Sequence, residues 1–232
     1  MSQKAIAIIP ARGGSVRMPR KNVAPFLGRP LIYWTVKAAL DSGIAERVFV
    51  NTDDAEIAEA GRAAGAEVPF LRPAELATSS ATTYDVIVHM LDTLRLSARY
   101  FVVMQATSPL RSADDVRAAY DLLVTQRAAA VVSVCGFDKP WPVLRRVDAA
   151  GQLQLLEEPA GGAPTHQLNG ALYLGSQATL CATRSFTPQG TLPYVMPATR
   201  SVDIDTPLDF HIAEAIAQNL PELFPSQGGT PD

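Results

Sequence analysis

The chain of 232 residues is poor in cysteine and histidine and has no long hydrophobic run. Its two cysteines, Cys135 and Cys181, stand far apart and outside any metal-ligand spacing. Neither a disulfide framework nor a cysteine-based metal site is expected, and a reducing compartment, the cytoplasm, is predicted. No apolar run approaches membrane-spanning length, and the one near the N-terminus is too short for a signal peptide, so no membrane partner is predicted.

Charge of either sign is not in large excess. The sequence has 20 lysine and arginine residues against 23 aspartate and glutamate residues, a net charge of −3. Outside one loop near the N-terminus there is no long basic run, which argues against nucleic acid as a partner. The hydrophobic share of 47% is enough for a substantial core.

Short apolar segments alternate with amphipathic ones as far as residue 135. Strands are predicted over residues 5–9, 47–53, 67–71, 100–105 and 129–135, and helices over 31–43, 54–65, 82–94 and 112–126. This alternation indicates an α/β fold, a mainly parallel sheet with helices on both faces. Ligands of such sheets bind beyond the carboxyl ends of the strands, so the loops after the strands are the candidate sites.

The regular alternation stops between about residues 137 and 168. This stretch contains four prolines and a DAAGQ turn, and it predicts a hairpin excursion from the sheet. A strand over 170–175, a short helix, a strand over 194–196 and a helix over 206–220 follow. No repeat or linker divides the chain, so we predict a single domain over residues 1–225 and a disordered tail over 226–232.

A basic loop follows the first predicted strand. The segment IIPARGGSVRMPRKN, residues 8–22, combines a glycine pair with the cations Arg12, Arg17, Arg20 and Lys21. Glycines let backbone N–H groups approach an anion and cations can close over it, which suits a nucleoside triphosphate. The loop is neither GxGxxG nor GxxxxGK[ST]. We expect Lys21 to lie outside the core. A solvated basic turn is the alternative on spacing alone.

Two carboxylates stand close together near the C-terminus. Asp203 and Asp205 in SVDIDTPLDF are two positions apart, so in an extended segment their side chains point the same way. Such a pair can hold Mg²⁺, which favours carboxylate and phosphate oxygens. The alternative is that the two acids cap the helix that begins near Pro207.

Three other polar segments follow predicted strands or precede one. MQATSPLR, residues 104–111, offers an amide and hydroxyls for base, ribose or sugar recognition, or serves only to start the next helix. NGALYL, residues 169–174, and LRPAELATSSATT, residues 71–83, can equally be a turn and a capped loop.

Taken together, six segments resemble the acylneuraminate cytidylyltransferases, the CMP-sialic acid synthetases. They are IIPARGGSVRMPRKN, NTDDAEIAE, LRPAELA, QATSPLR, NGALYLG and SVDIDTPLDF, in the order seen in that family, from residue 5 to about residue 215. The first is shared with sugar nucleotidyltransferases in general, whereas QATSPLR and DIDT together are more specific. The resemblance implies a Rossmann-like nucleotidyltransferase fold that transfers the cytidylyl group of CTP to the anomeric hydroxyl of a nonulosonic acid and releases pyrophosphate.

The resemblance also implies roles for single residues and for the excursion. The nucleotide would be bound by Arg12, Gly13, Ser15, Arg20, Lys21, Asn22, Arg72 and Ser80. The acid sugar or its supporting loop would involve Gln105, Arg111, Gln167 and Asn169. Lys21, Arg12 and Asp205 would be catalytic, and Asp203 and Asp205 would bind Mg²⁺, with Mn²⁺ as a substitute. The excursion resembles the family's dimerisation segment, so a homodimer is expected.

The chain departs from the family pattern at three places. Val16 stands where many relatives have lysine, so a phosphate contact is missing or comes from Arg17. Ala106 stands where proline is usual. Gln167 and Leu168 stand where relatives that use sialic acid often carry Arg-Pro, which leaves the acceptor sugar open. The alternatives are a related nucleotidyltransferase with another acid sugar or nucleotide, and a non-catalytic sugar-nucleotide-binding protein, which the intact cation and carboxylates disfavour.

Overall fold

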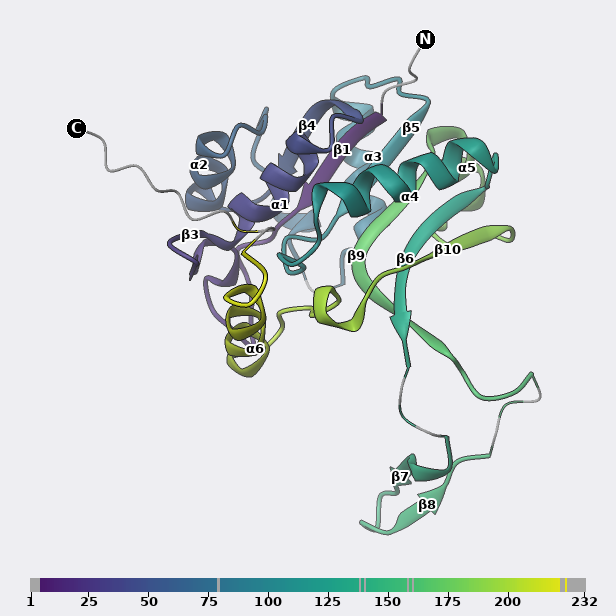
Figure 1. Cartoon of the computed structure of the whole chain (residues 1–232). Coiled ribbons are helices and arrows are strands. Elements are labelled where there is room, and N and C mark those ends of the chain that lie inside the picture. The colour runs from purple at the N-terminus through teal and green to yellow at the C-terminus, as the bar shows by residue number, and fades with distance from the viewer. Residues whose placement is uncertain are drawn as a thin grey trace.

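A six-stranded sheet forms the centre of the computed structural model, which describes residues 5–78, 80–137, 139, 141–157, 159, 161–221 and 224 (Figure 1). Its strand order is β10-β6-β9-β5-β1-β4. The strands are β1 (Ala5–Pro10), β4 (Ala45–Asn51), β5 (Tyr100–Met104), β6 (Ala130–Gly136), β9 (His166–Ser176) and β10 (Thr191–Val195). The predicted tail over 226–232 lies outside the described residues.

The sheet is mostly parallel, as predicted, but one strand runs the other way. β1 is parallel to both β4 and β5, and β10 is parallel to β6. β9 lies between β5 and β6 and is antiparallel to both. The chain leaves the sheet after β6 and returns beside it with no helix packed across a face, and a return of that kind delivers a strand in the opposite direction.

Helices cover both faces of the sheet. In one hydrophobic cluster Ala7 and Ile9 of β1 pack with Ile32 of α1, together with α2 and α4. In the other, Ile8 packs with Met90 of α3 and with α5. The helices are α1 (Leu31–Asp41), α2 (Ala55–Ala63), α3 (Thr83–Thr93), α4 (Ala113–Thr125) and α5 (Gln177–Thr183). The alternation along β1 sends neighbouring side chains to opposite layers.

Two local predictions differ from the structure. Residues 67–71 form no strand: Glu67 makes an isolated bridge to Phe49, and Pro69, which has no N–H to donate, follows two positions later. A small antiparallel pair, β2 (Pro25–Phe26) and β3 (Arg29–Pro30), was not predicted. Short 3₁₀ helices complete the described elements: η1 (Lys21–Val23), η2 (Ala74–Leu76), η3 (Trp141–Val143) and η4 (Ala198–Arg200).

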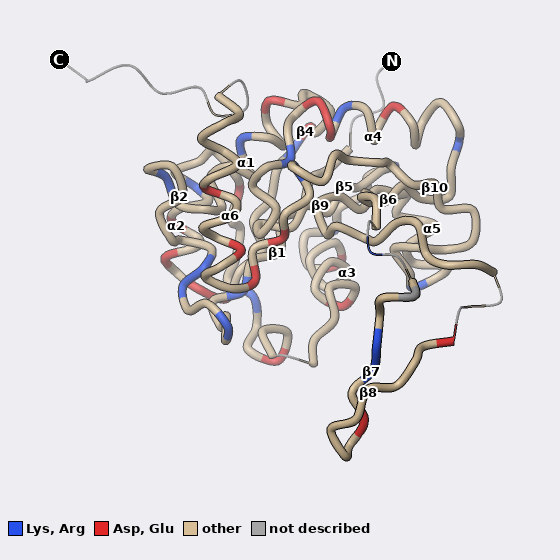
Figure 2. Tube along the Cα trace, turned by 60° about the horizontal axis from the view of Figure 1, so that its bottom comes forward, with Lys and Arg blue, Asp and Glu red and all other residues tan. Residues whose placement is uncertain are grey.

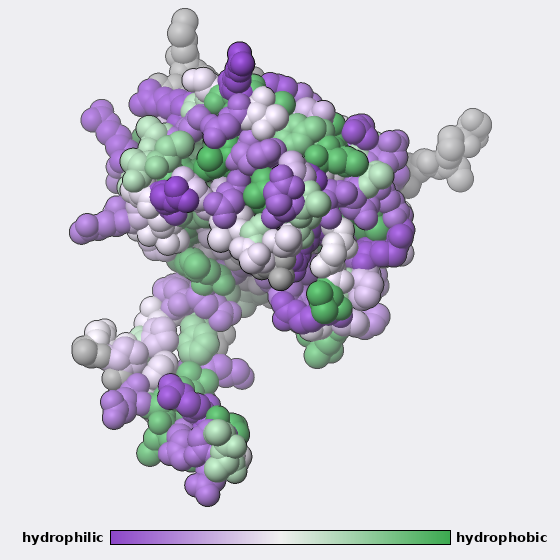
Figure 3. Space-filling model, turned by 180° about the vertical axis from the view of Figure 1, so that it is seen from behind, coloured by the Kyte–Doolittle hydropathy of each residue, from purple (hydrophilic) through white to green (hydrophobic). Residues whose placement is uncertain are grey.

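The predicted excursion is present as an arm, which we define as residues 137–165. It carries the hairpin of β7 (Arg145–Val147) and β8 (Leu153–Leu155), which pair only with each other and stand clear of the body (Figures 1 and 3). Leu153 and Leu155 are 71% and 77% exposed. The arm therefore presents apolar side chains that its own chain does not bury.

The last helix, α6 (Pro207–Ala217), lies beside the sheet rather than over it. It packs through Phe210 in a third hydrophobic cluster, which also contains Phe26 of β2, Leu31 of α1 and Ile204. This cluster brings the segment before α6 next to the loop after β1. None of the described helices is long and apolar enough to cross a membrane.

Candidate active site

A cavity of about 380 Å³ lies where the predicted site residues come together. The predicted residues that line it are Arg12, Ser15, Lys21, Asn22, Gln105, Asp203 and Asp205. They come from the loops after β1 and β5 and from the segment before α6, so residues far apart in the sequence share one wall. A larger cavity, about 880 Å³, lies between α1 and the end of α6, but among the predicted residues it touches only Arg111. The smaller cavity is therefore the candidate site.

Charges of both signs meet at this end of the sheet. Figure 2 shows cationic and anionic residues side by side around α2, α6 and the end of β1. Arg20 is in an ion pair with Glu56 of α2, and Asp205 is in ion pairs with Arg17 and Lys21. The basic loop of a slightly acidic protein is thus balanced locally by carboxylates.

The start of the basic loop is fixed by backbone contacts. Gly13 N donates to Asp53 Oδ1 at 3.1 Å, and Asn22 Nδ2 donates to Arg12 O at 3.0 Å. A Cβ on Gly13 would come within 2.8 Å of Asp54, so only glycine fits this close approach. Asp53 was not among the predicted site residues, although it stands in the segment NTDDAEIAE. Its position directly after β4, at the same edge as the basic loop, is the signal that could have found it.

Lys21 is buried, which corrects the expectation that it lies outside the core. It is 7% exposed, and its Nζ donates to Ile204 O at 2.5 Å and to Asp205 Oδ1 at 3.0 Å. Its aliphatic stem enters the protein while the ammonium reaches a carbonyl and a carboxylate, which compensate a buried charge. Lys21 thereby joins the basic loop to the segment before α6.

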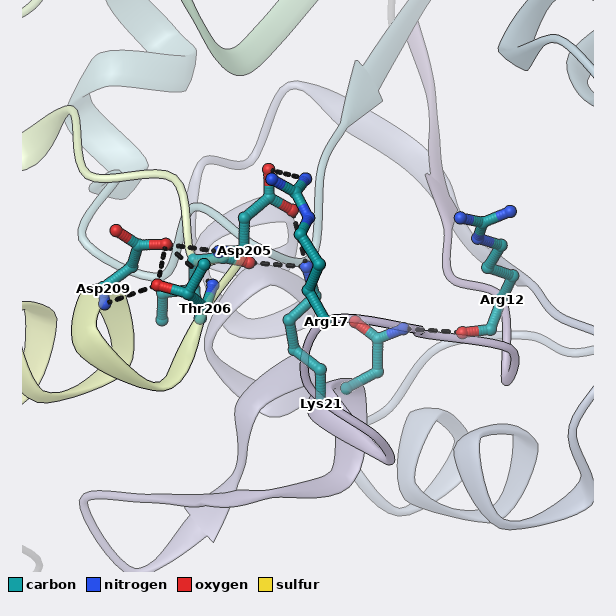
Figure 4. Close-up of polar contacts among 8 residues, drawn as sticks. Arg12, Arg17, Lys21, Asp205, Thr206 and Asp209 are labelled. Carbon is teal, nitrogen blue, oxygen red and sulfur yellow. Dashed lines mark hydrogen bonds and ion pairs between the residues drawn. The ribbon is translucent and has the colours of Figure 1, made fainter. Parts of the chain in front are cut away.

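Both oxygens of Asp205 accept hydrogen bonds from cations. Lys21 bonds to Oδ1, and Arg17 Nη2 donates to Oδ2 at 2.5 Å. Figure 4 shows Arg17 and Lys21 converging on Asp205, with Arg12 standing apart from this group. Arg17 was considered in the sequence only as a substitute phosphate contact beside Val16. Its ion pair with Asp205 was not predicted, because nothing local links it to a residue near the C-terminus.

Asp203 lies near Asp205 and Thr107. Loss of surrounding water raises the pKa of its carboxyl, and the charge of Asp205 raises it further, while a bond from Thr107 and the charge of Lys21 act against the shift. Asp203 lines the cavity but is exposed overall, so water still reaches the residue and screens part of this effect. Tyr173, also on the cavity wall, has a raised pKa because of burial and the charge of Asp203.

The two acids do not cap α6. Thr206 is the N-cap residue: its side chain accepts from Asp209 N, and the Asp209 carboxylate accepts from Thr206 N at 2.7 Å. Asp203 and Asp205 thus keep their carboxylates on the cavity wall. Within the described residues no group of three or more His, Cys, Asp or Glu side chains is placed to hold a metal. Two carboxylates on a cavity wall beside a basic loop do suit Mg²⁺, which takes one or two protein carboxylates and keeps its other ligands as water or phosphate.

Two predicted arginines support loops and do not line the cavity. Arg72 Nε donates to Asn51 Oδ1 at 2.6 Å. Arg111 donates to Ala171 O at 3.2 Å through Nε and to Gln105 O at 2.9 Å through Nη2. Burial lowers the pKa of Arg111 to about 9. Arg111 therefore holds the loop that carries Gln105, which is one of the two roles that the resemblance implied.

The predicted sugar-side residues of β9 also lie off the cavity wall. The Asn169 amide is buried, accepting from Ser133 Oγ at 2.6 Å and donating to Ser201 Oγ at 2.9 Å. Gln167 is exposed on the same strand. Tyr173, further along β9, does line the cavity and was not predicted. Asn169 is thus used inside the protein, where it joins β6, β9 and the segment after β10.

The remaining nucleotide-side residues, Arg20 and Ser80, do not line the cavity. Arg20 has a positive φ of 57° and pairs with Glu56, away from the wall. Ser80 is exposed, and its hydroxyl lies 3.0 Å from Thr78 Oγ1. The Thr78 carbonyl accepts from Arg12 Nη1 at 3.5 Å, so the loop that carries Ser80 borders the basic loop.

Similarity to known proteins covers nearly the whole chain. The sequence model of the family described as Cytidylyltransferase matches residues 6–139. The chain is also 32% identical over 226 residues to the CMP-N,N'-diacetyllegionaminic acid synthase of Legionella pneumophila, covering 93% of this chain and 97% of that protein. This chain belongs to the cytidylyltransferase family. The resemblance read from the six segments is confirmed.

Other relatives of this cytidylyltransferase are named for related sugars. It is 31% identical over 223 residues to a pseudaminic acid cytidylyltransferase of Campylobacter jejuni, covering 92% of this chain and 96% of that one. It is 33% identical over 224 residues to the N-acylneuraminate cytidylyltransferase of Escherichia coli, where it spans 94% of its own length and 53% of the longer relative.

Solved structures share the fold of this cytidylyltransferase. A CMP:2-keto-3-deoxy-manno-octonic acid synthetase complexed with CTP has a TM-score of 0.70 at 18% identity, covering 93% of this chain and 99% of that one. A 4-diphosphocytidyl-2C-methyl-D-erythritol synthase from Anaerococcus prevotii has a TM-score of 0.62 at 12% identity, with the same coverage. At these identities the likeness shows the fold, and the predicted nucleotidyltransferase fold is confirmed.

Proposed function

We propose that this cytidylyltransferase transfers the cytidylyl group of CTP to the anomeric hydroxyl of a nonulosonic acid and releases pyrophosphate. The observation that carries the proposal is the contact of the basic loop with the carboxylate segment: Lys21 and Asp205 form an ion pair on the wall of one cavity. The chain is similar over more than 90% of its length to relatives named for legionaminic, pseudaminic and N-acylneuraminic acids.

The reaction asks the protein for alignment and charge neutralisation. The sugar hydroxyl oxygen forms a bond to the α-phosphorus of CTP, the bond from that phosphorus to pyrophosphate breaks, and the hydroxyl proton passes to water. Arg12, Lys21 and the backbone N–H groups of the basic loop neutralise the triphosphate and then the departing pyrophosphate. No covalent nucleophile is required.

Asp203 and Asp205 are the residues that would hold Mg²⁺, or Mn²⁺ in its place. When bound, the metal supplies charge neutralisation at the phosphate oxygens and lowers the pKa of the attacking hydroxyl. The chain itself orients this pair: Ile204, between the two acids, is fully buried, and its N–H donates to Thr107 O at 2.8 Å. Both carboxylates are thereby held beside the loop after β5, which carries Gln105.

The identity of the acid sugar depends on how its carboxylate is held. β9, whose residues are all described, carries no lysine or arginine, and Gln167 stands where sialic-acid-using relatives often have arginine. We infer that Gln105, Thr107 and Tyr173, which line the cavity, contact the sugar. A different nonulosonic acid, or a cation from a second copy of the chain, would satisfy this site.

We propose a homodimer in which the arm of one copy covers the site of the other. The exposed apolar residues of β7 and β8 support this proposal, because such surface is stabilised by burial against a partner. Lys139 or Arg145 of the arm would then reach the neighbouring site. A reducing compartment, the cytoplasm, stays the predicted location, since Cys135 and Cys181 are unpaired.

Pyrophosphate release with CTP and a panel of nonulosonic acids tests the function. We expect release with at least one of these acids and none when the acid is omitted. Calorimetry with CTP and GTP is the second measurement, in which we expect CTP to bind more tightly. Tighter binding of GTP than of CTP would contradict CTP as the nucleotide substrate. CTP binding without pyrophosphate release for any of the acid sugars would indicate a non-catalytic binding protein.

A further inference from the structure

Arg17 occupies a position in the site that its local surroundings do not explain. Its neighbour in the chain, Val16, is 87% exposed. Among the described residues, Asp205 is the only carboxylate within hydrogen-bond distance of Arg17, at 2.5 Å. Both residues line the same cavity. Arg17 therefore competes for a carboxylate that the proposed function assigns to a metal ion.

The two cations on Asp205 are held in different ways. The Lys21 side chain is 9% exposed, and its ammonium is also bonded to Ile204 O, so it is fixed. The Arg17 side chain is 65% exposed. Between residues 14 and 19 the backbone makes one backbone-to-backbone hydrogen bond, from Ser15 N to Gly13 O. Arg17 thus sits on the least constrained part of the loop, and its ion pair is exposed and weak.

We propose that Arg17 is an exchangeable counter-ion of Asp205. Before substrates bind, Arg17 neutralises the Asp205 carboxylate through its bond to Oδ2. When a divalent cation takes Asp205, the guanidinium is released toward the triphosphate, where a bidentate contact to phosphate is available. This inference rests on the proposed function, because it takes CTP and the metal as the ligands of the cavity.

The proposal gives Arg17 opposite effects on the two ligands. Arg17 opposes metal binding in the absence of nucleotide, because the metal must displace it from Asp205. Arg17 favours CTP, because the same guanidinium adds a cation to the phosphate site. Since coupling between two bound ligands is reciprocal, CTP that draws Arg17 away strengthens metal binding, and the metal strengthens CTP binding. A cation that served only as a phosphate contact would affect the binding of CTP and not the binding of the metal.

The test measures each ligand separately on the full chain and on two variants. Mn²⁺ binding without nucleotide is followed by the electron paramagnetic resonance signal of the free ion. CTP binding is followed by calorimetry in the presence of EDTA. Arg17→Ala removes the proposed counter-ion. Arg20→Ala is the matched control. It removes the same charge from the same loop, but Arg20 pairs with Glu56 and not with Asp205.

We expect Arg17→Ala to bind Mn²⁺ about two- to fivefold more tightly than the wild type, as the loss of an exposed ion pair allows. We expect its metal-free CTP affinity to fall by about tenfold, as for a lost charged hydrogen bond. Arg20→Ala should not tighten Mn²⁺ binding, because a charge further away is screened by salt.

Unchanged or weaker Mn²⁺ binding in Arg17→Ala would overturn the proposal, and so would equal tightening in Arg20→Ala. If the wild type binds CTP and releases pyrophosphate, either result rejects only the role proposed for Arg17 and leaves the proposed function standing. A wild type that binds no CTP and releases no pyrophosphate rejects the proposed function instead.

Discussion

The Nζ atom of Lys21 lies 3.0 Å from Oδ1 of Asp205, although 184 positions separate the two residues in the chain. The same ammonium donates to the carbonyl of Ile204, whose side chain is buried in the cluster that seats α6. The contact therefore closes the basic loop onto the carboxylate segment. It makes one site of two motifs that stand at opposite ends of the sequence.

Lys21→Met should lower kcat/KM at least tenfold with a moderate loss of stability. Methionine keeps an apolar stem in the buried position but leaves the phosphates and Asp205 without the ammonium, a charged interaction of about 1.5–3 kcal/mol. Steady-state pyrophosphate release measures the effect. Lys37→Met on α1 is the control, because that lysine pairs with Asp41 outside the cavity and should keep normal kinetics. Normal kinetics in Lys21→Met would remove the residue from the phosphate site.

Asp205→Asn should reduce activity by orders of magnitude and lower the melting temperature moderately, because the buried Lys21 ammonium loses its carboxylate partner and keeps the carbonyl of Ile204. The amide keeps the shape and loses the charge that Mg²⁺ requires, and raised Mn²⁺ should restore part of the rate. In the wild type, metal affinity should be weak without CTP and stronger with it. Asp92→Asn, an exposed carboxylate of α3, should behave like the wild type. A variant Asp205→Asn with normal activity and metal dependence would require another metal site.

Deleting residues 149–162 should weaken dimerisation and activity together. The deletion removes β8 and with it the exposed Leu153 and Leu155. These two side chains share a face of the strand, so Leu153→Ser with Leu155→Ser tests the same surface and keeps the hairpin. Light scattering at micromolar concentration, beside the pyrophosphate assay, gives both readouts. A fully active wild-type monomer would contradict the shared site.

Asp115→Asn should lower the free energy of unfolding by about 3 kcal/mol near neutral pH, because it leaves part of a buried charge network without its anion. Asp115 is 1% exposed and accepts from Arg200 Nη2 at 2.7 Å and from Tyr194 Oη at 3.0 Å. Burial alone would raise its pKa, but the bonds from Arg200 and Ser112 outweigh this, so the pKa lies below the ordinary value of 3.8.

The sign of that shift sets the pH window. A carboxyl whose pKa is lowered by folding stabilises the protein fully above its unfolded pKa, and the contribution is lost as the pH falls through the folded pKa. Urea unfolding at about pH 7 and about pH 3 should therefore show a difference between the wild type and Asp115→Asn that shrinks in acid. Asp114→Asn, the exposed neighbour, should change little. A difference that stays constant with pH would contradict the ion pair.

Much of the fold follows from local pattern. The apolar run of β1 and the helical spacing of Val86, Ile87 and Met90 in α3 identify elements whose preferences act over a few residues. Ser112, the first residue of the helix predicted over 112–126, forms the capping box of α4. The direction of β9 could not be predicted in this way, because an apolar run buried on both faces carries no sign of which way its strand points.

The candidate site, too, could be predicted only in part from the sequence. Its residue types could be found from the sequence, because glycines, cations and paired carboxylates at strand ends have a local chemical signature. Which of these residues face the cavity could not be predicted from the sequence. Asn169 turns inward to Ser133, and Arg17 reaches Asp205, because hydrophobic packing of distant segments fixes where each backbone lies. Local propensities decide which elements form. The burial of apolar surface between elements, which depends on the whole chain, decides which charges meet.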